Sequence, residues 1–165
     1  MEPKPGDQKF KILFLCTGNS ARSILAEYFL RRLDPTHFET FSAGASPKGR
    51  VNPYVLELLR DIYHIDASDA RSKSWEEYHD VNFDFVVTVC DKARESCPIW
   101  PGQPIVAHWS SDDPDEVQGG EEEKKRVIKR VGQEIYRRLQ LFCALPIQSL
   151  DRLRLEQLTK AIGTQ

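Results

Sequence analysis

The chain has 165 residues, of which 40% are hydrophobic and 29% are charged, so it can bury one core and has the size of a single domain. Its 23 basic and 25 acidic residues give a formal net charge of -2, which excludes a chain-wide positive field for nucleic acid or an anionic membrane surface. No apolar run approaches the roughly 18 residues of a membrane-spanning helix, so we expect a soluble domain without a membrane partner.

The amino terminus from Met1 to Asp7 is short and polar and lacks the apolar segment of a secretion signal. We therefore expect residues 1–9 to form a flexible tail and the protein to be cytoplasmic. In that reducing compartment, cysteines are more often free, catalytic or metal-binding than joined in structural disulfides. The chain has four of them, Cys16, Cys90, Cys97 and Cys143.

Strands and helices alternate in the predicted amino-terminal half. Residues 9–15 form an almost continuous apolar run typical of a buried strand, and apolar residues at three- and four-residue spacing predict a helix at 20–33. A second strand follows at 38–43, a second helix at 52–63 and a short helix at 75–79. Asp34-Pro35 ends the first of these helices.

The alternation continues in the carboxy-terminal half. Strands are predicted at 83–90, which is rich in valine, and at 104–109. Three glutamates at 121–123 begin a long helix with one apolar stripe, and Pro146 breaks it. Spaced apolar residues in the segment 146–165 predict a final short helix packed on the same domain.

Such alternation predicts a mostly parallel sheet covered by helices on both faces, because parallel strands need crossover connections. In α/β folds of this kind the functional site lies at the carboxyl ends of the strands. Polar loops leave those ends after Leu15, after Val89 and after Trp109. We expect the three loops to converge.

The first loop predicts an oxyanion site, because it joins a strand to a helix and contains small and polar residues. Its backbone N–H groups can surround one tetrahedral anion at the helix N-terminus, and Gly18 and Asn19 tolerate the left-handed backbone angles of a tight ring. Arg22 is expected to hold two oxygens of the anion. The residues assigned to anion binding are Thr17, Gly18, Asn19, Ser20, Ala21, Arg22 and Ser23.

Cys16, at the start of this loop, is the predicted nucleophile. The helix N-terminus, the Arg22 guanidinium and the Ser23 hydroxyl are expected to favour its thiolate form and aim it at a phosphate-like or arsenate-like anion. The alternative is a cysteine that merely ends a buried strand. The flanking strand and helix favour the functional interpretation.

The third loop supplies a candidate general acid. Asp113 precedes Pro114 in an acidic run, and a carboxyl group held over the anion can donate a proton to the departing oxygen. A solvated acidic turn is the alternative on turn statistics. A calcium-binding loop is excluded because the required ligand spacing and glycine are absent.

The second loop carries two thiols, Cys90 and Cys97. Cys90 follows the third strand and is therefore expected at the same sheet edge as Cys16. If residues 91–96 are helical, the two Cα atoms lie about 10 Å apart at ~1.5 Å per residue, beyond the roughly 7 Å that a disulfide allows. A Cys90–Cys97 disulfide would require this segment to unwind, which suggests a redox relay.

These thiols have two other possible interpretations. Cys97 could be incidental beside a buried Cys90, or the pair could bind zinc with His108, but zinc sites usually show closer cysteine spacing and a second close pair. We therefore expect no metal. Cys143 lies in an apolar segment and is most simply a core residue.

Together, these segments resemble thiol-dependent arsenate reductases built on the low-molecular-weight tyrosine phosphatase fold. The resemblance covers residues 10–145, taken as the catalytic domain. It rests on Cys-Thr-Gly-Asn-Ser-x-Arg-Ser at 16–23, Phe-Ser-Ala-Gly at 41–44, Val-Asn-Pro at 51–53, Val-Thr-Val-Cys with Cys-Pro seven residues on, and His-Trp followed by Asp-Asp-Pro. It implies a three-layer α/β/α domain with a four-stranded parallel sheet.

The resemblance also implies a reaction. Cys16 attacks arsenate, for which phosphate competes, while Arg22 clamps the oxyanion and Asp113 protonates the departing hydroxide. Cys90 then attacks the Cys16 sulfur and releases arsenite, and Cys97 resolves the disulfide. An external thiol reductant, either thioredoxin or glutathione with glutaredoxin, restores the thiols, and no resident cofactor is expected.

This chain departs from the family pattern near the anion loop. Relatives that bind a potassium ion there use an Asn, a Glu, a Ser and an Asp, matched by Asn19, Glu27 and Ser42, whereas Lys73 falls at the fourth position. We expect its ammonium to replace the metal cation. Ala21 stands where several relatives have another cysteine, with little expected effect because the backbone N–H binds the anion.

Two alternative functions share the anion loop. A phosphotyrosine phosphatase usually carries tyrosines after the Asp-Pro pair, whereas Asp115 and Glu116 follow here and predict an acidic rim that repels phosphopeptides. A non-catalytic oxyanion-binding regulatory domain ranks third, since a nucleophile, an acid and two further thiols exceed what binding needs.

Overall fold

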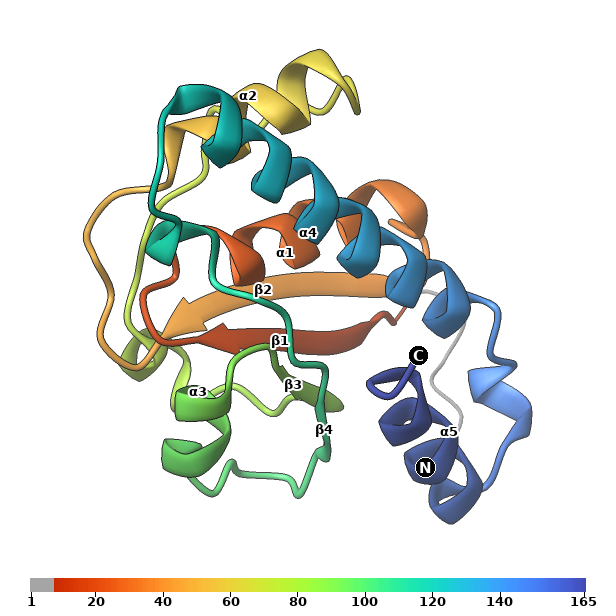
Figure 1. Cartoon of the computed structure of the whole chain (residues 1–165). Coiled ribbons are helices and arrows are strands. Elements are labelled where there is room, and N and C mark those ends of the chain that lie inside the picture. Colours follow the sequence, from red (N-terminus) through yellow and green to blue (C-terminus); the bar gives the residue numbers. More distant parts are fainter. Residues whose placement is uncertain (1–7) are drawn as a thin grey trace.

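The computed structural model describes residues 8–165 and contains one sheet with helices around it (Figure 1). Its four strands are all parallel and lie in the order β2-β1-β3-β4. Their bounds are β1 (Phe10–Cys16), β2 (Phe38–Gly44), β3 (Phe85–Thr88) and β4 (Ile105–His108). The predicted four-stranded parallel sheet is confirmed. The first seven residues of the expected tail lie outside the described residues.

Five α-helices connect and cover the strands within residues 8–165. They are α1 (Arg22–Leu33), α2 (Pro53–Asp61), α3 (Asp91–Ser96), α4 (Glu121–Cys143) and α5 (Arg152–Ile162), with 3-10 turns η1 (Trp75–Tyr78), η2 (Pro114–Glu116) and η3 (Ile147–Ser149). Figure 1 shows α1 and α4 together on one face of the sheet and α3 on the other side. None of these helices is both long enough and apolar enough to cross a membrane.

β1 is a central strand with β2 on one side and β3 on the other. Its near-continuous apolar sequence fits this place, because a central parallel strand is buried on both faces. In the register, Cys16 lies opposite Gly44 of β2, and Leu15 lies opposite Thr88 of β3. The last residue of β1 is therefore brought to the carboxyl edge of the sheet among the ends of its neighbours.

Helix α1 begins at Arg22, two residues later than predicted, and its N-terminus has no side-chain cap. Ala21, the N-cap residue, has no side-chain oxygen that could accept a hydrogen bond from the first free N–H groups of the helix. In contrast, Asn52 caps α2 and Asp151 caps α5, each by accepting a backbone N–H at 2.8 Å. The free N–H groups of α1 remain available at the edge where the loops meet.

The predicted strand at 83–90 is shortened to Phe85–Thr88. Val89 N still donates to Leu15 O, but Cys90 turns away as the N-cap of α3. Residues 91–96 are helical, which is the condition under which the two thiols of this segment lie at opposite ends of a helix.

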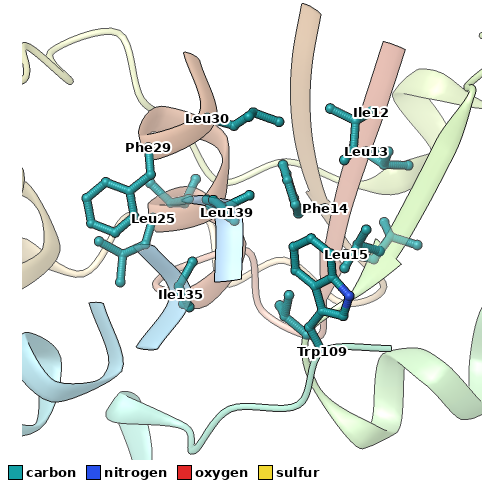
Figure 2. Packing of buried hydrophobic residues seen from close by; sticks show 14 of the residues in the cluster. Ile12, Leu13, Phe14, Leu15, Leu25, Phe29, Leu30, Trp109, Ile135 and Leu139 are labelled. Carbon is teal, nitrogen blue, oxygen red and sulfur yellow. The ribbon is translucent and has the colours of Figure 1, made fainter. Parts of the chain in front are cut away.

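The main core lies between the sheet and the pair formed by α1 and α4 (Figure 2). Phe14 of β1 faces Leu25 of α1 and Leu139 of α4, and all three side chains are fully buried. The ring centroid of Trp109, the residue after β4, lies 6.4 Å from that of Phe14 and 5.7 Å from that of Phe142. The loop after β4 therefore begins at a residue fixed in the core.

The apolar stripe of α4 supplies a direct test of this packing. Leu139 is 0% exposed and Leu141, two residues on in the same helix, is 38% exposed. We expect Leu139→Ala to lower the free energy of unfolding by about 2–5 kcal/mol, because it leaves a cavity in the core. Leu141→Ala should cost about 1 kcal/mol or less, as urea unfolding of both variants would measure. Equal losses would contradict the assignment of the buried face.

Candidate active site

The three predicted loops converge on a cavity of about 400 Å³ at the carboxyl edge of the sheet. Cys16, Arg22, Cys90 and Asp113 all line it, so the structure brings together four of the five predicted catalytic side chains. Cys97 is not among the lining residues. The cavity is open to solvent, and its floor is the loop between β1 and α1.

The Cys16 sulfur lies buried on this floor. Its Sγ accepts a hydrogen bond from the backbone N–H of Asn19 at 3.1 Å and lies 2.9 Å from Ser23 Oγ. Both partners belong to the loop or to the first turn of α1, whose free N–H groups attract negative charge. The sulfur is therefore fixed at the place where an anion bound by the loop would lie.

Asn19 holds the loop in this shape. Its φ of 45° lies in the left-handed region, which Asn tolerates better than most residues. Its side chain is fully buried and donates from Nδ2 to Ser23 Oγ at 2.8 Å and to Ser42 Oγ at 3.1 Å. The strained backbone angle is thereby fixed by bonds to both α1 and β2.

Gly18 does not have the left-handed angle predicted for it. Within the described residues, positive φ values among glycines occur only at Gly49, Gly102 and Gly119. A Cβ on Gly18 would lie 3.1 Å from side-chain atoms of Lys48, so the glycine makes room for this lysine. Gly18 is therefore required because a larger residue would crowd the Lys48 side chain, and not because of its backbone angle.

Lys73 occupies the centre of a buried polar cluster beneath the loop. Its Nζ donates to Ser42 Oγ at 3.0 Å and to Asn19 Oδ1 at 3.3 Å, and lies 3.7 Å from Glu27 Oε1. Burial lowers the pKa of Lys73 below its ordinary value, and the Glu27 carboxylate opposes this shift. The ammonium thus contacts Asn19, Glu27 and Ser42, the three side chains that the family resemblance matches to potassium ligands.

Arg22 and Asp113 meet across the cavity. Arg22 Nη1 donates to the carbonyl of Ser111 at 3.0 Å, and its Nη2 lies 3.4 Å from Asp113 Oδ2. The other carboxylate oxygen of Asp113 accepts the backbone N–H of Asp115 at 2.9 Å. The carboxyl group is therefore oriented from both sides and placed next to the predicted anion clamp.

Cys90 and Cys97, the two thiols predicted to form a relay, lie at opposite ends of α3. Cys90 Sγ lies 3.3 Å from Thr17 Oγ1 in the anion loop and accepts the Ala93 N–H at 3.4 Å as the helix cap. Cys97 follows the last residue of α3, and burial raises the pKa of its thiol. Seven residues at ~1.5 Å rise separate the Cα atoms by about 10 Å, so the thiols cannot bond while α3 is intact.

His108 contacts side chains of β3 and α3 with both of its ring nitrogens. Its Nδ1 lies 2.8 Å from Thr88 Oγ1, and its Nε2 lies 2.9 Å from Asp91 Oδ1 in the first turn of α3. In residues 8–165 there is no group of three His, Cys, Asp or Glu side chains that could hold a metal ion. His108 therefore links the end of β3 to the first turn of α3.

A bridge across the mouth of the cavity is a feature that the sequence analysis missed. Asp115 accepts from Lys48 Nζ at 2.7 Å and from Asn52 Nδ2 at 2.7 Å. Burial raises the pKa of Asp115, but these two hydrogen bonds outweigh it and leave the pKa below its ordinary value. The predicted acidic rim is wrong at this position, because the Asp115 charge is neutralised by Lys48.

This bridge separates the anion cavity from a second cavity of about 300 Å³. Lys48 and Asp115 line both cavities, whereas Tyr54 lines only the second. Asp115 directly follows the Asp-Pro pair and Lys48 directly follows Pro47, so only the folded chain brings them together. No local pattern in either segment indicated the contact.

Cys143 is half-buried at the end of α4 and takes no part in the cavity. Burial raises the pKa of its thiol to about 11, and the Asp34 carboxylate adds to this shift. The thiol is therefore protonated and unreactive at neutral pH.

Comparison with known proteins adds a family to this geometry. The model of the low molecular weight phosphotyrosine protein phosphatases matches residues 11–152. An arsenate reductase from Halalkalibacterium halodurans is 37% identical over 131 residues, which are 79% of this chain and 93% of that protein.

Two solved structures extend the comparison. An arsenate reductase from Archaeoglobus fulgidus is 27% identical with a TM-score of 0.59, over 78% of this chain and 98% of that one. A thioredoxin-dependent arsenate reductase from Corynebacterium glutamicum is 26% identical with a TM-score of 0.55, over 83% of this chain and 65% of that one.

The Lys73 cluster predicts that potassium has no role in this protein. Lys73→Met should lower the free energy of unfolding by about 3 kcal/mol, the lower end for breaking a buried ion pair, because Arg31 still contacts Glu27. Urea unfolding in sodium or potassium chloride measures it, with Lys129→Met, an exposed lysine, as the control. A potassium-dependent gain in wild-type stability or turnover would contradict the replacement of a metal by the ammonium.

Proposed function

Because the chain belongs to the low molecular weight phosphotyrosine protein phosphatase family, we propose that it is an arsenate reductase whose nucleophile is Cys16. The observation that carries this proposal is the presence of Cys90 in the same cavity as Cys16, Arg22 and Asp113. A phosphatase needs a nucleophile, an anion clamp and an acid. A second thiol is needed only when two electrons must be delivered to the substrate, because formation of a disulfide supplies them.

The first step forms a bond between sulfur and arsenic. The Cys16 thiolate attacks As(V) while the loop N–H groups and Arg22 hold the remaining oxygens. Asp113 donates a proton to the departing hydroxide, which leaves as water. The contact of Arg22 Nη2 with Asp113 Oδ2 at 3.4 Å supports this pairing, since acid and clamp act on neighbouring oxygens.

The second step reduces arsenic. Cys90 attacks the Cys16 sulfur, a disulfide forms between them, and the electron pair of the sulfur–arsenic bond stays with arsenic, which departs as arsenite. Thr17 Oγ1, 3.3 Å from Cys90 Sγ, holds the attacking thiol beside the anion loop. The protein loses two electrons, and As(V) becomes As(III).

The third step moves the disulfide away from the cavity. Cys97 attacks Cys90, frees Cys16 as a thiolate and leaves a Cys90–Cys97 disulfide. Because α3 separates the two cysteines, this step requires the helix to unwind. The raised pKa of Cys97 keeps its thiol protonated while α3 is folded, which disfavours attack before the helix opens.

The proposed reductant is a dithiol protein of the thioredoxin class, acting in the cytoplasm. In the proposed cycle the oxidised protein carries its disulfide between Cys90 and Cys97. A single external dithiol can reduce such a disulfide by two successive exchange steps. The similarity to a thioredoxin-dependent arsenate reductase points the same way. Glutathione with a glutaredoxin is the alternative, in which the external thiol replaces Cys97 in the attack.

A phosphotyrosine phosphatase is the second candidate function, because it would share Cys16, Arg22 and Asp113. The bridge of Lys48 and Asp115 argues against it, since these side chains meet at the mouth where the organic part of a phosphate ester would leave the cavity. A non-catalytic anion-binding role ranks third, because it gives no use to Cys90 and Cys97.

The internal relay predicts a single turnover without any added thiol. Fully reduced protein mixed with arsenate should release about one arsenite per chain, because its own thiols supply both electrons. Disulfide mapping by mass spectrometry should then find Cys90 bonded to Cys97. Cys97→Ser should still release arsenite but stop with Cys16 bonded to Cys90, whereas Cys90→Ser should release none.

Cys143→Ser is the matched control, since this thiol lies outside the cavity. It should leave both the arsenite yield and the disulfide unchanged. Release of arsenite only after addition of glutathione would remove the role of Cys97. No arsenite under any condition, with an aryl phosphate hydrolysed, would favour the phosphatase.

The bridge predicts a gain of activity on larger substrates. Lys48→Ala and Asp115→Ala each break the bridge, and each should raise kcat/KM for an aryl phosphate about tenfold, within the range that pocket contacts give to specificity. The two changes have opposite effects on charge, so an equal rise excludes a purely electrostatic cause. Glu116→Ala, which removes a neighbouring carboxylate that also lines the cavity, should give no such rise. A similar rise in Glu116→Ala would show that the negative charge around the cavity, and not the bridge, limits the access of aryl phosphates.

A further inference from the structure

Helix α5 lies almost entirely beyond the family match, which ends at residue 152. It packs against β4 and α4 and buries Leu155, Thr159 and Ile162. The carbonyl of Thr159 accepts a hydrogen bond from Trp109 Nε1 at 3.0 Å. The end of α5 is therefore bound to the residue from which the acid-bearing loop departs.

The residue after α5 approaches the same strand end even more closely. A Cβ built on Gly163 would lie 2.1 Å from the carbonyl oxygen of His108, although the φ of this glycine is ordinary. Only a residue without a side chain permits this approach. The fit at Gly163 fixes where α5 ends relative to β4.

Arg138 of α4 connects the end of α5 with the acid-bearing loop. The residue is 7% exposed, and its guanidinium donates from Nη1 to Ser110 O at 2.8 Å and from Nη2 to Gly163 O at 3.4 Å. Nη1 also lies 3.3 Å from Glu134 Oε1. One buried cation thus binds the backbone of both segments.

The contacts continue from Ser111 to the reacting groups. Ser111 Oγ donates to Glu134 Oε1 at 2.8 Å, and its carbonyl accepts from Arg22 Nη1 at 3.0 Å. Arg22 in turn contacts Asp113. The loop backbone is therefore held from behind by α4 and from the front by the anion clamp.

We propose that Arg138 is a positioning residue for Asp113, and that α5 fixes Arg138 in its place. This inference rests on the proposed function, because it takes Asp113 as the general acid. Residues 109–113 have no helix or strand to set their position, so their place depends on these bonds. A displacement of about 1 Å at a catalytic group can cost up to 10²-fold in rate.

The cost of burying Arg138 supports a specific role. Its Nε has no hydrogen-bond partner in the described part of the chain, and buried charges are often no more stabilising than an apolar side chain of similar volume. An apolar residue at this position would fill the core but would leave the carbonyls of Ser110 and Gly163 without this donor. The hydrogen bonds of the guanidinium fix the position of the loop, which a hydrophobic residue cannot do.

The test compares Arg138→Gln with Arg137→Gln, which removes the same charge from an exposed position on the same helix. Single-turnover release of arsenite from reduced protein is the main readout. We expect Arg138→Gln to lower this rate roughly 10- to 100-fold, while alkylation of Cys16 by iodoacetamide stays unchanged. Arg138→Lys should recover part of the rate, and Arg137→Gln should match the wild type.

Coupling to the acid separates positioning from a general loss of structure. If Arg138 acts through Asp113, the double variant Arg138→Gln/Asp113→Asn should be no slower than Asp113→Asn alone. The wild-type pH–rate profile should contain a limb that reports protonation of the general acid Asp113. This limb should be weaker in Arg138→Gln and in Asp113→Asn. A double variant whose rate loss equals the product of the two single losses would overturn the proposal. An unchanged rate in Arg138→Gln would overturn it as well.

Gly163→Ala tests the part played by α5 if Arg138→Gln does not fold. Its Cβ should displace the end of α5 from His108 and lower the arsenite rate in the same direction, whereas Gly120→Ala, which faces open space, should not. If Gly163→Ala has the wild-type rate, α5 has no role in positioning.

Failure of the proposed function is recognised separately. A wild-type protein that releases no arsenite would overturn the reductase, but the same variants can then be compared in the hydrolysis of an aryl phosphate, where Asp113 would protonate the departing phenolate. Loss of coupling between Arg138 and Asp113 in that assay would overturn the positioning role alone.

Discussion

The side chain of Asn19 joins the three parts of the molecule on which the anion loop rests. It binds the first turn of α1 through Ser23, the strand β2 through Ser42, and the segment just before η1 through Lys73. Loss of one partner would leave buried polar groups unpaired, at a cost of about 1–3 kcal/mol each. The loop therefore keeps Asn19 in the left-handed region and leaves the N-terminus of α1 uncapped, because any other arrangement would break hydrogen bonds of the buried polar cluster beneath it.

The other working groups are supported in different ways, and the difference follows their roles. Cys16 belongs to the sheet and is buried, as a nucleophile that must meet each anion in the same place requires. Asp113 lies in an irregular loop and depends on bonds to Arg22 and to the residues behind it. Cys90 and Cys97 lie at the ends of a six-residue helix, a length that is marginal without tertiary contacts. The structural support around each group thus decreases from Cys16 to Asp113 and then to the two proposed relay thiols.

Most of the fold could be predicted from the sequence, because apolar runs and helical spacing report burial directly. The shorter β3 and the later start of α1 could not, since they depend on where the chain turns toward the cavity. The bridge of Lys48 and Asp115 is a contact between distant segments of ordinary polar composition. Arg138 did leave a signal, because it falls three residues after Ile135 and four before Phe142, on the buried stripe of α4.

The placement of two thiols at the ends of α3 also links helix stability to redox chemistry. In the proposed relay, α3 is intact in the dithiol form and must unwind before Cys90 and Cys97 can bond, so whatever stabilises α3 also favours the dithiol. About 1.4 kcal/mol of helix stability corresponds to about 30 mV in the reduction potential of a two-electron couple. In that relay, the stability of the six residues between the cysteines, which include the hydrogen bond from the Ser96 hydroxyl to the Lys92 carbonyl, helps to determine which reductants are strong enough to restore the dithiol.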